Sequence, residues 1–148
     1  MKSKLLKQKT RTNLINYLID NRGFKSYLEI GVQVPANNYD KIICEKKCGV
    51  DPAALGAVTH PMTSDKFFQD NIDSFDIIFI DGLHLSEQVA KDADNGLKCL
   101  NKNGVLVFHD CMPKMKLHAQ RNRESIQWNG DVWKAAMYIR MNYKNVNL

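Results

Sequence analysis

The sequence contains no long apolar run. Its longest apolar stretches, such as residues 77–80, are only a few residues long, whereas a helix that crosses a bilayer needs about 20 apolar residues. The basic start of the chain is not followed by the apolar segment of a secretory signal. These absences predict a protein of the cytoplasm that has no membrane partner.

The spacing of the cysteines excludes the common zinc sites. The four cysteines do not form a CxxC pair, and no histidine extends them into a zinc-binding pattern. We interpret all four as reduced thiols, the state that a cytoplasmic compartment maintains. Their predicted role is that of small apolar filler.

Acidic residues are scarce at both ends of the chain. Residues 1–11 hold five basic and no acidic side chains, residues 112–148 hold seven basic and two acidic ones, and the residues between are net acidic. Basic ends are typical of a solvated rim, and they also suit contact with nucleic acid or another anion. A hydrophobic content of 44% with a net charge of only +5 excludes a disordered chain.

Strand and helix patterns alternate along the 148 residues. This alternation predicts a single α/β domain, a Rossmann-like three-layer sandwich with a mostly parallel sheet. We divide it into an N-terminal helix (1–24), a cofactor-binding core (25–111), and a basic loop with a last helix (112–148). The predicted strands are Ser26–Ile30, Lys47–Val50, Phe75–Ile80 and Val105–Phe108. The predicted helices span residues 3–21, 37–46, 66–71, 86–100 and 132–141.

Charged and polar residues follow the predicted strands. In a parallel sheet, ligands bind outside the carboxyl ends of the strands. A buried strand that ends in a carboxylate is costly unless the carboxylate meets water, a ligand or a partner. The sequence therefore predicts a polar site at this edge of the sheet. The residues that we place there are Glu29 to Gly31, Asp51, Thr63 to Asp65, Asp81 to His84, and His109 with Asp110.

Gly31 precedes an acid by about 20 residues, at Asp51, which is the spacing of a nucleoside-binding βαβ unit. In such a unit the glycine lets the ligand approach the backbone, and the acid accepts hydrogen bonds from ribose hydroxyls. The alternatives are that Asp51 only caps the turn before Pro52 and that Glu29 pairs with a lysine. Residues 31–35 lack the further glycines that a pyrophosphate needs, which argues against a dinucleotide and a nicotinamide enzyme.

Several segments together resemble one enzyme family. In order and spacing they are similar to class I S-adenosylmethionine-dependent methyltransferases, in particular a small bacterial branch related to sugar and macrolide O-methyltransferases. The resemblance extends over about residues 25–141. The segments that carry it are Tyr27–Val32, Gly49–Pro52, Ser64–Phe68, Phe75–His84, Val107–Asp110 and Trp128–Lys134.

The resemblance implies S-adenosylmethionine as the cofactor and places site residues around it. Glu29 and Gly31 would line the methionine and ribose part, and Asp51 would hold the ribose hydroxyls. Ser64 and Asp65 would lie near the adenine. Asp81 would border the methyl group and the pocket of a small-molecule substrate.

The same resemblance raises the question of a metal. In related metal-dependent O-methyltransferases, acids after the fourth and fifth strands hold magnesium, and Asp81 and Asp110 match those places. His109 stands where the family often has a second acid or an amide. Such a metal would lower the pKa of the acceptor hydroxyl.

The candidate catalytic residues are Asp81, His84, His109 and Asp110. His84 precedes a predicted helix, whose dipole would keep its imidazole neutral, and a neutral imidazole can act as a general base. Either histidine would then take the proton of the acceptor. Trp128 and Trp133 suit a sugar or aromatic substrate, although for Trp133, on the last predicted helix, we favour a place in the core.

We predict a methyltransferase that modifies a hydroxyl of a small molecule or sugar. A nucleoside-binding module without catalysis is one alternative. A nucleic-acid methyltransferase is another, although the chain lacks an Asn-Pro-Pro-aromatic or Asp-Pro-Pro-aromatic stretch after the strand at Phe75–Ile80.

The closing hairpin of strands six and seven that the family carries is expected to be absent. An uncovered sheet edge presents unpaired backbone groups. A homodimer that pairs two such edges, or a truncated chain, is the expected consequence.

Overall fold

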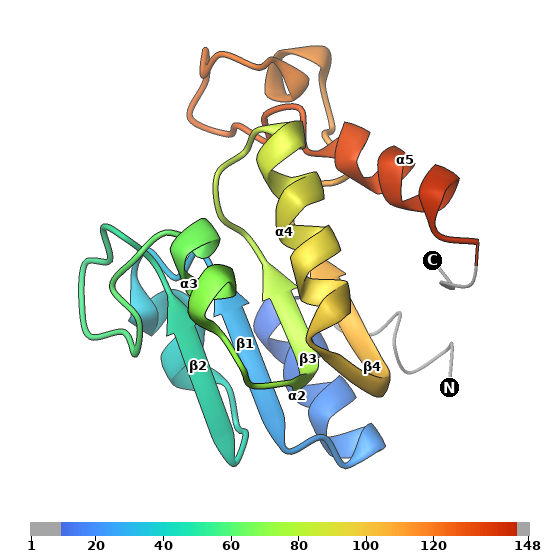
Figure 1. The fold of residues 1–148 in the computed structure, drawn as a ribbon. Coiled ribbons are helices and arrows are strands. Elements are labelled where there is room, and N and C mark those ends of the chain that lie inside the picture. Colours follow the sequence, from blue (N-terminus) through green and yellow to red (C-terminus); the bar gives the residue numbers. More distant parts are fainter. Residues whose placement is uncertain (1–9, 145–148) are drawn as a thin grey trace.

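The computed structural model describes residues 10–144. Within them, four strands form one sheet in the order β2-β1-β3-β4, and every neighbouring pair is parallel (Figure 1). This arrangement confirms the predicted α/β fold with a parallel sheet. The strands are β1 (Ser26–Ile30), β2 (Lys46–Val50), β3 (Phe75–Ile80) and β4 (Leu100–Phe108).

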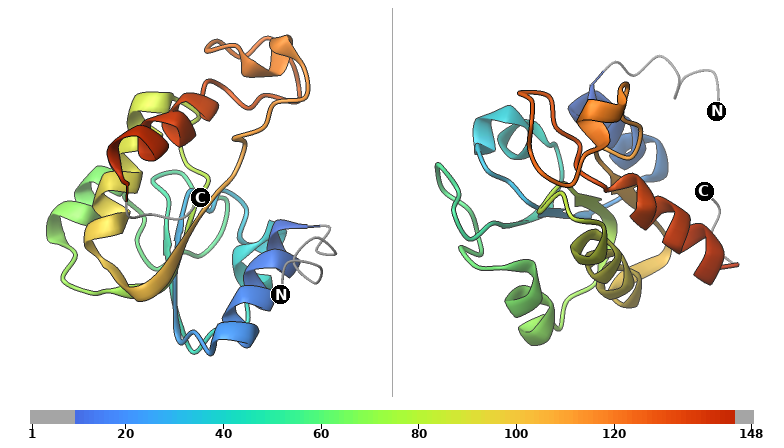
Figure 2. Two further views of the ribbon diagram at one scale, coloured as in Figure 1. Left: turned by 90° about the vertical axis from the view of Figure 1, so that its right-hand side faces the viewer. Right: turned by 90° about the horizontal axis from the view of Figure 1, so that it is seen from above.

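Helices cover both faces of the sheet, which makes three layers (Figure 2). Helix α2 lies on one face, whereas α3 and α4 lie on the other, and α5 contacts α4. The helices are α2 (Arg11–Arg22), α3 (Ser64–Asp70), α4 (Ser86–Lys98) and α5 (Trp133–Asn142). Among the described residues, no helix is long and apolar enough to cross a membrane.

Alternate residues of the strands supply two apolar cores. Tyr27, Ile77 and Phe79 belong to the core against α2, while Leu28 and Ile78 belong to the core against α4. Because successive side chains of a strand point to opposite faces, a strand covered on both faces must be apolar throughout. The continuous apolar sequence of β3 satisfies this condition.

The strands end at one level. Ile30 of β1 pairs with both Val50 of β2 and Ile80 of β3, and Ile80 pairs with Phe108 of β4. The residues that follow these four positions therefore gather along a single edge of the sheet.

Helix α2 begins later than predicted. Thr10 is extended, with φ −128° and ψ 155°, and its side chain accepts a hydrogen bond from the backbone N–H of Asn13. Thr10 is therefore the N-cap, and the helix does not run continuously from residue 3, a position that lies outside the described residues. Gly23 ends the helix in the left-handed conformation, as expected.

Two other predictions, both for the first half of the chain, are wrong. The helix expected over residues 37–46 is replaced by two short 3-10 helices, η1 (Pro35–Asn37) and η2 (Tyr39–Lys41), which Asn38 separates with a non-helical φ of −147°. Thr63 does not follow a strand either. Between β2 and Thr63, the described chain forms one isolated parallel bridge, from Val50 to His60. Thr63 itself caps α3. In the described sheet, Asp81 and Asp110 thus follow the third and fourth strands.

Strand β4 is longer than predicted. We expected a turn at Asn103 and Gly104, but both residues lie inside the strand. Asn103 has a φ of 65°, and the pairing with β3 shifts register between Phe75 and Ile77. The turn signal therefore marks a bulge, at which one extra residue is accommodated.

The predicted absence of a closing hairpin agrees with the described residues, where all strands are parallel and β2 and β4 form the two edges. The pairing of two copies along such an edge stays a prediction. The last residues of the proposed edge segment, 145–148, lie outside the described part of the chain.

Candidate active site

A cavity of about 740 Å³ opens at the carboxyl edge of the sheet. Its volume lies within the roughly 300–1,000 Å³ that is usual for small-molecule sites. All of the predicted site residues except Glu29 line it. The topological rule that places ligands at this edge therefore also holds here.

The structure explains the glycine at position 31 differently from the sequence-based expectation. Its φ is 86°, and a Cβ atom there would lie 2.2 Å from the backbone oxygen of Asp81. The glycine is therefore required because the chain after β1 passes against the chain after β3. Close approach of a ligand is not needed to explain it.

Asp51 is anchored by the turns around it. Its Oδ2 accepts a hydrogen bond from the N–H of Gln33 at 2.7 Å, and its Oδ1 accepts one from the N–H of Ala53 at 2.8 Å. The carboxylate therefore does cap the turn before Pro52. It also borders the cavity, and each of its oxygens can accept a second hydrogen bond. Capping and ribose binding are compatible at this residue.

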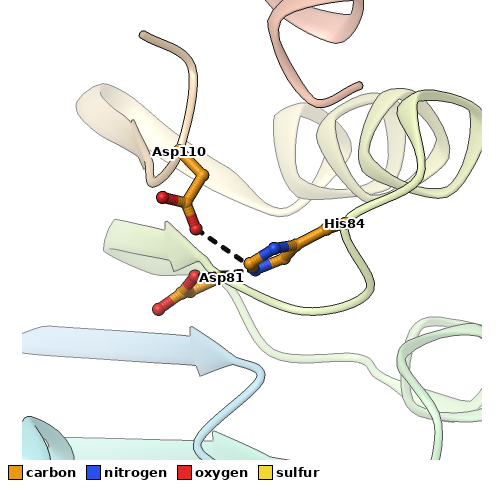
Figure 3. Close-up of side chains that lie close together, drawn as sticks. All are labelled: Asp81, His84 and Asp110. Atoms are coloured by element: carbon orange, nitrogen blue, oxygen red, sulfur yellow. Dashed lines mark ion pairs between the residues drawn. The ribbon is translucent and has the colours of Figure 1, made fainter. Parts of the chain in front are cut away.

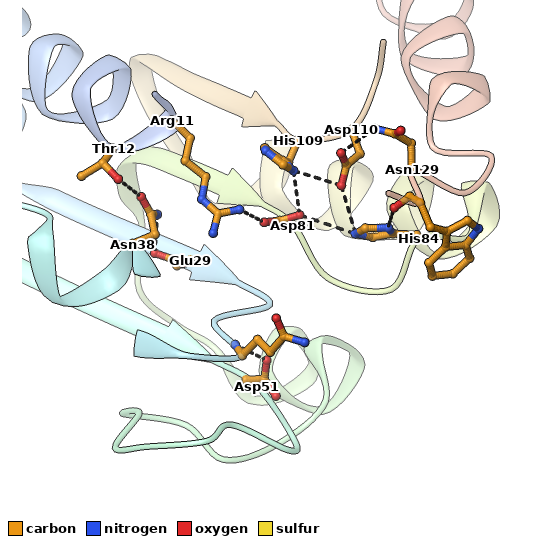
Figure 4. Close-up of polar contacts among 12 residues, drawn as sticks. Arg11, Thr12, Glu29, Asn38, Asp51, Asp81, His84, His109, Asp110 and Asn129 are labelled. Carbon is orange, nitrogen blue, oxygen red and sulfur yellow. Dashed lines mark hydrogen bonds and ion pairs between the residues drawn. The ribbon is translucent and has the colours of Figure 1, made fainter. Parts of the chain in front are cut away.

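Glu29 lies behind the cavity wall. It is fully buried, and its Oε2 accepts hydrogen bonds from the Tyr27 hydroxyl at 2.5 Å and from Asn38 Nδ2 at 3.1 Å. Burial raises the pKa of Glu29 to about 7. No lysine of the described residues pairs with Glu29, in contrast to the alternative that we considered. Asn38 in turn accepts from Thr12, so this network joins β1 to α2 (Figure 4).

Two carboxylates and a histidine meet at the ends of β3 and β4 (Figure 3). His84 Nε2 lies 3.2 Å from Asp110 Oδ2 and 3.6 Å from Asp81 Oδ1. Asp110 has a φ of 57°, a conformation that aspartate tolerates better than most residues. Its other oxygen, Oδ1, accepts a hydrogen bond from Asn129 Nδ2 at 2.6 Å.

The surroundings of His84 favour protonation of both ring nitrogens. Its Nδ1 lies 3.0 Å from the carbonyl oxygen of Trp128, which can only accept, while Nε2 faces two carboxylates. Contacts with Asp81 and then Asp110 raise the pKa of His84 despite its burial. This direction is opposite to the one that we expected from the helix dipole, because the two nearby carboxylates favour the charged imidazole.

His109 completes the cluster. Its Nδ1 lies 3.0 Å from Asp110 Oδ2 and 3.2 Å from Asp81 Oδ1, at ion-pair distance although without hydrogen-bond alignment. Asp110 and Asp81 raise the pKa of His109 to about 9. The side chain is 38% exposed. Among the described residues, none forms a hydrogen bond with its Nε2.

Arg11 is a site residue that the sequence did not reveal. The Nη1 atom of this first residue of α2 donates to Asp81 Oδ2 at 2.7 Å (Figure 4). Burial alone would raise the pKa of Asp81, but His109, His84 and Arg11 together lower it. The only signal was the basic N-terminal stretch, which we interpreted as a rim or an anion-binding surface.

The loop between β4 and α5 closes one side of the site. The Trp128 ring packs against His84, with 5.1 Å between the ring centroids, and lines the cavity, as expected for a substrate contact. A Cβ atom on Gly130 would lie 2.0 Å from the backbone oxygen of His84. Buried Asp131 accepts from the N–H of Ser86 at 2.8 Å and so caps the start of α4.

The donor set does not fit the magnesium ion that we considered. Asp81, His84 and Asp110 each offer one ligand atom, within 4.8 Å of one another. One of the three is an imidazole, whereas magnesium prefers oxygen ligands in near-octahedral geometry. The two carboxylates are also already neutralised by His84, His109 and Arg11.

Comparison with known proteins gives the family. A family model described as a methyltransferase domain matches residues 25–111, which is more than half of the chain. The chain belongs to this family of methyltransferases, and such a domain uses S-adenosylmethionine as the methyl donor. No match was found among curated proteins. The cavity volume and the spare acceptor capacity of Asp51 fit this cofactor.

Replacement of Asp51 tests its place in the cofactor site. Asp51→Ala should weaken binding of S-adenosylhomocysteine by about 1.5–3 kcal/mol, the usual contribution of hydrogen bonds to a charged group. Isothermal titration calorimetry measures this change. Asp70→Ala, which removes a carboxylate paired with Lys66 on the exposed side of α3, is the control. Equal affinities of the wild type and Asp51→Ala would refute the assignment.

Removal of divalent ions tests the donor-set argument. An ion that binds only the folded state of a protein raises the melting temperature of that protein. We expect the same melting temperature in EDTA and in excess Mg²⁺, for the wild type and for Asp110→Ala alike. A rise with Mg²⁺ in the wild type alone would show that the two carboxylates do hold the ion.

Proposed function

We propose that this methyltransferase transfers the methyl group to a hydroxyl oxygen of a small molecule or sugar, with His109 as the general base. The observation that carries the proposal is the position of His109 Nδ1 between Asp81 and Asp110, at the cavity end of β4. The two carboxylates lie at ion-pair distance from one ring nitrogen, and none of the described residues occupies the other, which can therefore accept a proton.

The tautomer of His109 follows from its neighbours. After loss of one proton, the remaining hydrogen stays on Nδ1, since the carboxylates of Asp81 and Asp110 can only accept. Nε2 then carries the lone pair that a base requires. S-adenosylmethionine supplies an electrophilic methyl group bonded to a sulfonium. As the acceptor oxygen forms its bond to that methyl carbon, the carbon–sulfur bond breaks and the hydroxyl proton passes to Nε2.

The remaining residues of the cluster position the reactants. Arg11 and His84 hold the two carboxylates in place from opposite sides. The Trp128 ring offers a flat apolar surface for a sugar or aromatic ring. Fixing an acceptor beside the base in this way supplies rate through orientation.

The pH dependence of the reaction tests the role of His109. With a pKa of about 9, the base form increases roughly tenfold per pH unit from pH 7, so kcat/KM should rise up to about pH 9 and then level. His109→Gln should lower kcat by about 10²- to 10⁴-fold, lose this rise, and keep its affinity for S-adenosylhomocysteine. The assay follows release of S-adenosylhomocysteine over a panel of hydroxyl compounds, with His60→Gln as control.

Three results would overturn this proposal. A rate independent of pH would remove histidine as the base. Cofactor binding without turnover on any acceptor would favour the non-catalytic nucleoside-binding module. Methylation of RNA or DNA in place of small molecules would favour the nucleic-acid enzyme.

The charge around the cavity supports an acceptor that is itself negative. Beside the cluster, Arg123 lines the cavity, and among the described residues its guanidinium approaches only the carbonyl oxygens of Ser125 and Ile126, at 3.5 and 3.4 Å. Arg121 of the same loop, by contrast, is bound by Glu87 and Asp131. An arginine without a carboxylate partner is suited to bind an anionic oxygen group of a ligand.

Paired acceptors test the role of Arg123. We expect the wild type to prefer the charged member of pairs that differ only by a phosphate or carboxylate, such as glucose and glucose 6-phosphate. Arg123→Gln should raise KM for the charged member roughly tenfold, as one charge-assisted hydrogen bond allows, and leave kcat unchanged. Arg140→Gln on α5 is the matched control. Equal use of both members by the wild type would contradict this role.

A further inference from the structure

The side chain of Gln88 has a fixed orientation in the cavity wall. Gln88 lies in the first turn of α4 and lines the cavity. Its Nε2 lies 3.3 Å from Ser64 Oγ, 3.1 Å from Asp65 Oδ1 and 3.1 Å from Asp92 Oδ1. Because carboxylates only accept, the nitrogen and not the oxygen of the amide must face the two aspartates. The amide cannot flip while these partners are in place.

The consequence is an unshared acceptor. Gln88 Oε1 occupies the other position of the amide, and none of the described residues donates to it. Gln88 is partly exposed and borders the cavity. The cavity wall therefore presents the amide oxygen of Gln88, which favours a ligand that has a hydrogen-bond donor at this position.

Asp92 secures this arrangement from behind. It is 1% exposed, and its Oδ2 has no hydrogen-bond partner among the described residues. That oxygen lies 3.8 Å from the place where a Cβ on Gly82 would stand, and Gly82 itself lines the cavity. Burial raises the pKa of Asp92 to about 6. A buried carboxyl with an unused oxygen costs stability, so stability alone does not explain this residue.

Ser64 and Asp65 are committed to the same network. We expected both to lie near the adenine, and both line the cavity. However, Asp65 Oδ2 is bound by Lys91 at 2.6 Å, and Asp65 Oδ1 accepts from Gln88. Each oxygen of Asp65 thus already accepts one hydrogen bond, whereas none of the described residues donates to the oxygen of Gln88.

We propose that Gln88 Oε1 accepts a hydrogen bond from the exocyclic amino group of the cofactor's adenine, and that Asp92 is the positioning residue that holds the amide in this orientation. The proposal rests on the use of S-adenosylmethionine by this cavity. The amino group of adenine donates to the oxygen. Hypoxanthine carries a carbonyl oxygen at the same place, so that two acceptors would oppose each other.

The experiment compares two ligands on several variants. S-adenosylhomocysteine and its deaminated analogue, S-inosylhomocysteine, are titrated by calorimetry. The wild type should prefer the adenine ligand at least tenfold, about the effect of one lost hydrogen bond. Gln88→Met should bind both about equally. Asp92→Leu should reduce the preference for S-adenosylhomocysteine over S-inosylhomocysteine, because the amide of Gln88 loses one of the acceptors that orient it.

Conservative variants separate positioning from general damage. Asp92→Asn should keep the preference, since its amide oxygen still accepts from Gln88. Asp94→Leu is the matched control, because Asp94 on the same helix binds the hydroxyls of Tyr138 and Tyr143 outside the cavity. This control variant should keep the wild-type ratio of the affinities for the two ligands.

Each failure has its own meaning. Failure of the wild type to bind either ligand would overturn the use of this cofactor and the inference with it. Equal binding of both ligands by the wild type would overturn the inference alone. So would an unchanged preference in Gln88→Met, or an Asp92→Asn variant that behaves like Asp92→Leu.

Discussion

The structure depends on the neutralisation of two carboxylates at the ends of adjacent strands. Asp81 and Asp110 lie close together in a partly buried setting, where two unpaired negative charges would be costly. Arg11, His84 and His109 offset that cost, and they come from α2, from the loop before α4 and from the end of β4. Elements that are distant in sequence thus converge on the same pair of carboxylates, which raise the pKa of both histidines.

The fold could be predicted because its signals are local and agree with one another. The apolar run of β3 requires cover on both faces, and alternating strands and helices provide that cover. Asp51, Asp81 and Asp110 could be placed at one edge for the same reason, since parallel strands in register end together. The cap at Thr10 and the bulge at Asn103 were harder, because a single residue decides each of them.

The state of the site could not be predicted, because it depends on contacts between segments. The local sequence of His84 shows only the dipole of its own helix, whereas contacts with Asp81, Asp110 and the carbonyl of Trp128 raise its pKa. Arg11 lies 70 residues from the carboxylate that it binds. Gln88 belongs to no motif, and its contacts with Asp65 and the buried Asp92 show which way its amide faces.

The bond between Asp131 and the N–H of Ser86 limits how freely the two halves of the site can be exchanged. Asp131 belongs to the loop that carries Trp128, our proposed contact of the acceptor, whereas the helix that it caps carries Gln88, our proposed contact of the cofactor. A loop grafted from another member of the family would have to bring its own cap for α4. Evolution of new acceptors in this scaffold is therefore easier through single side chains such as Trp128 and Arg123 than through replacement of the whole loop.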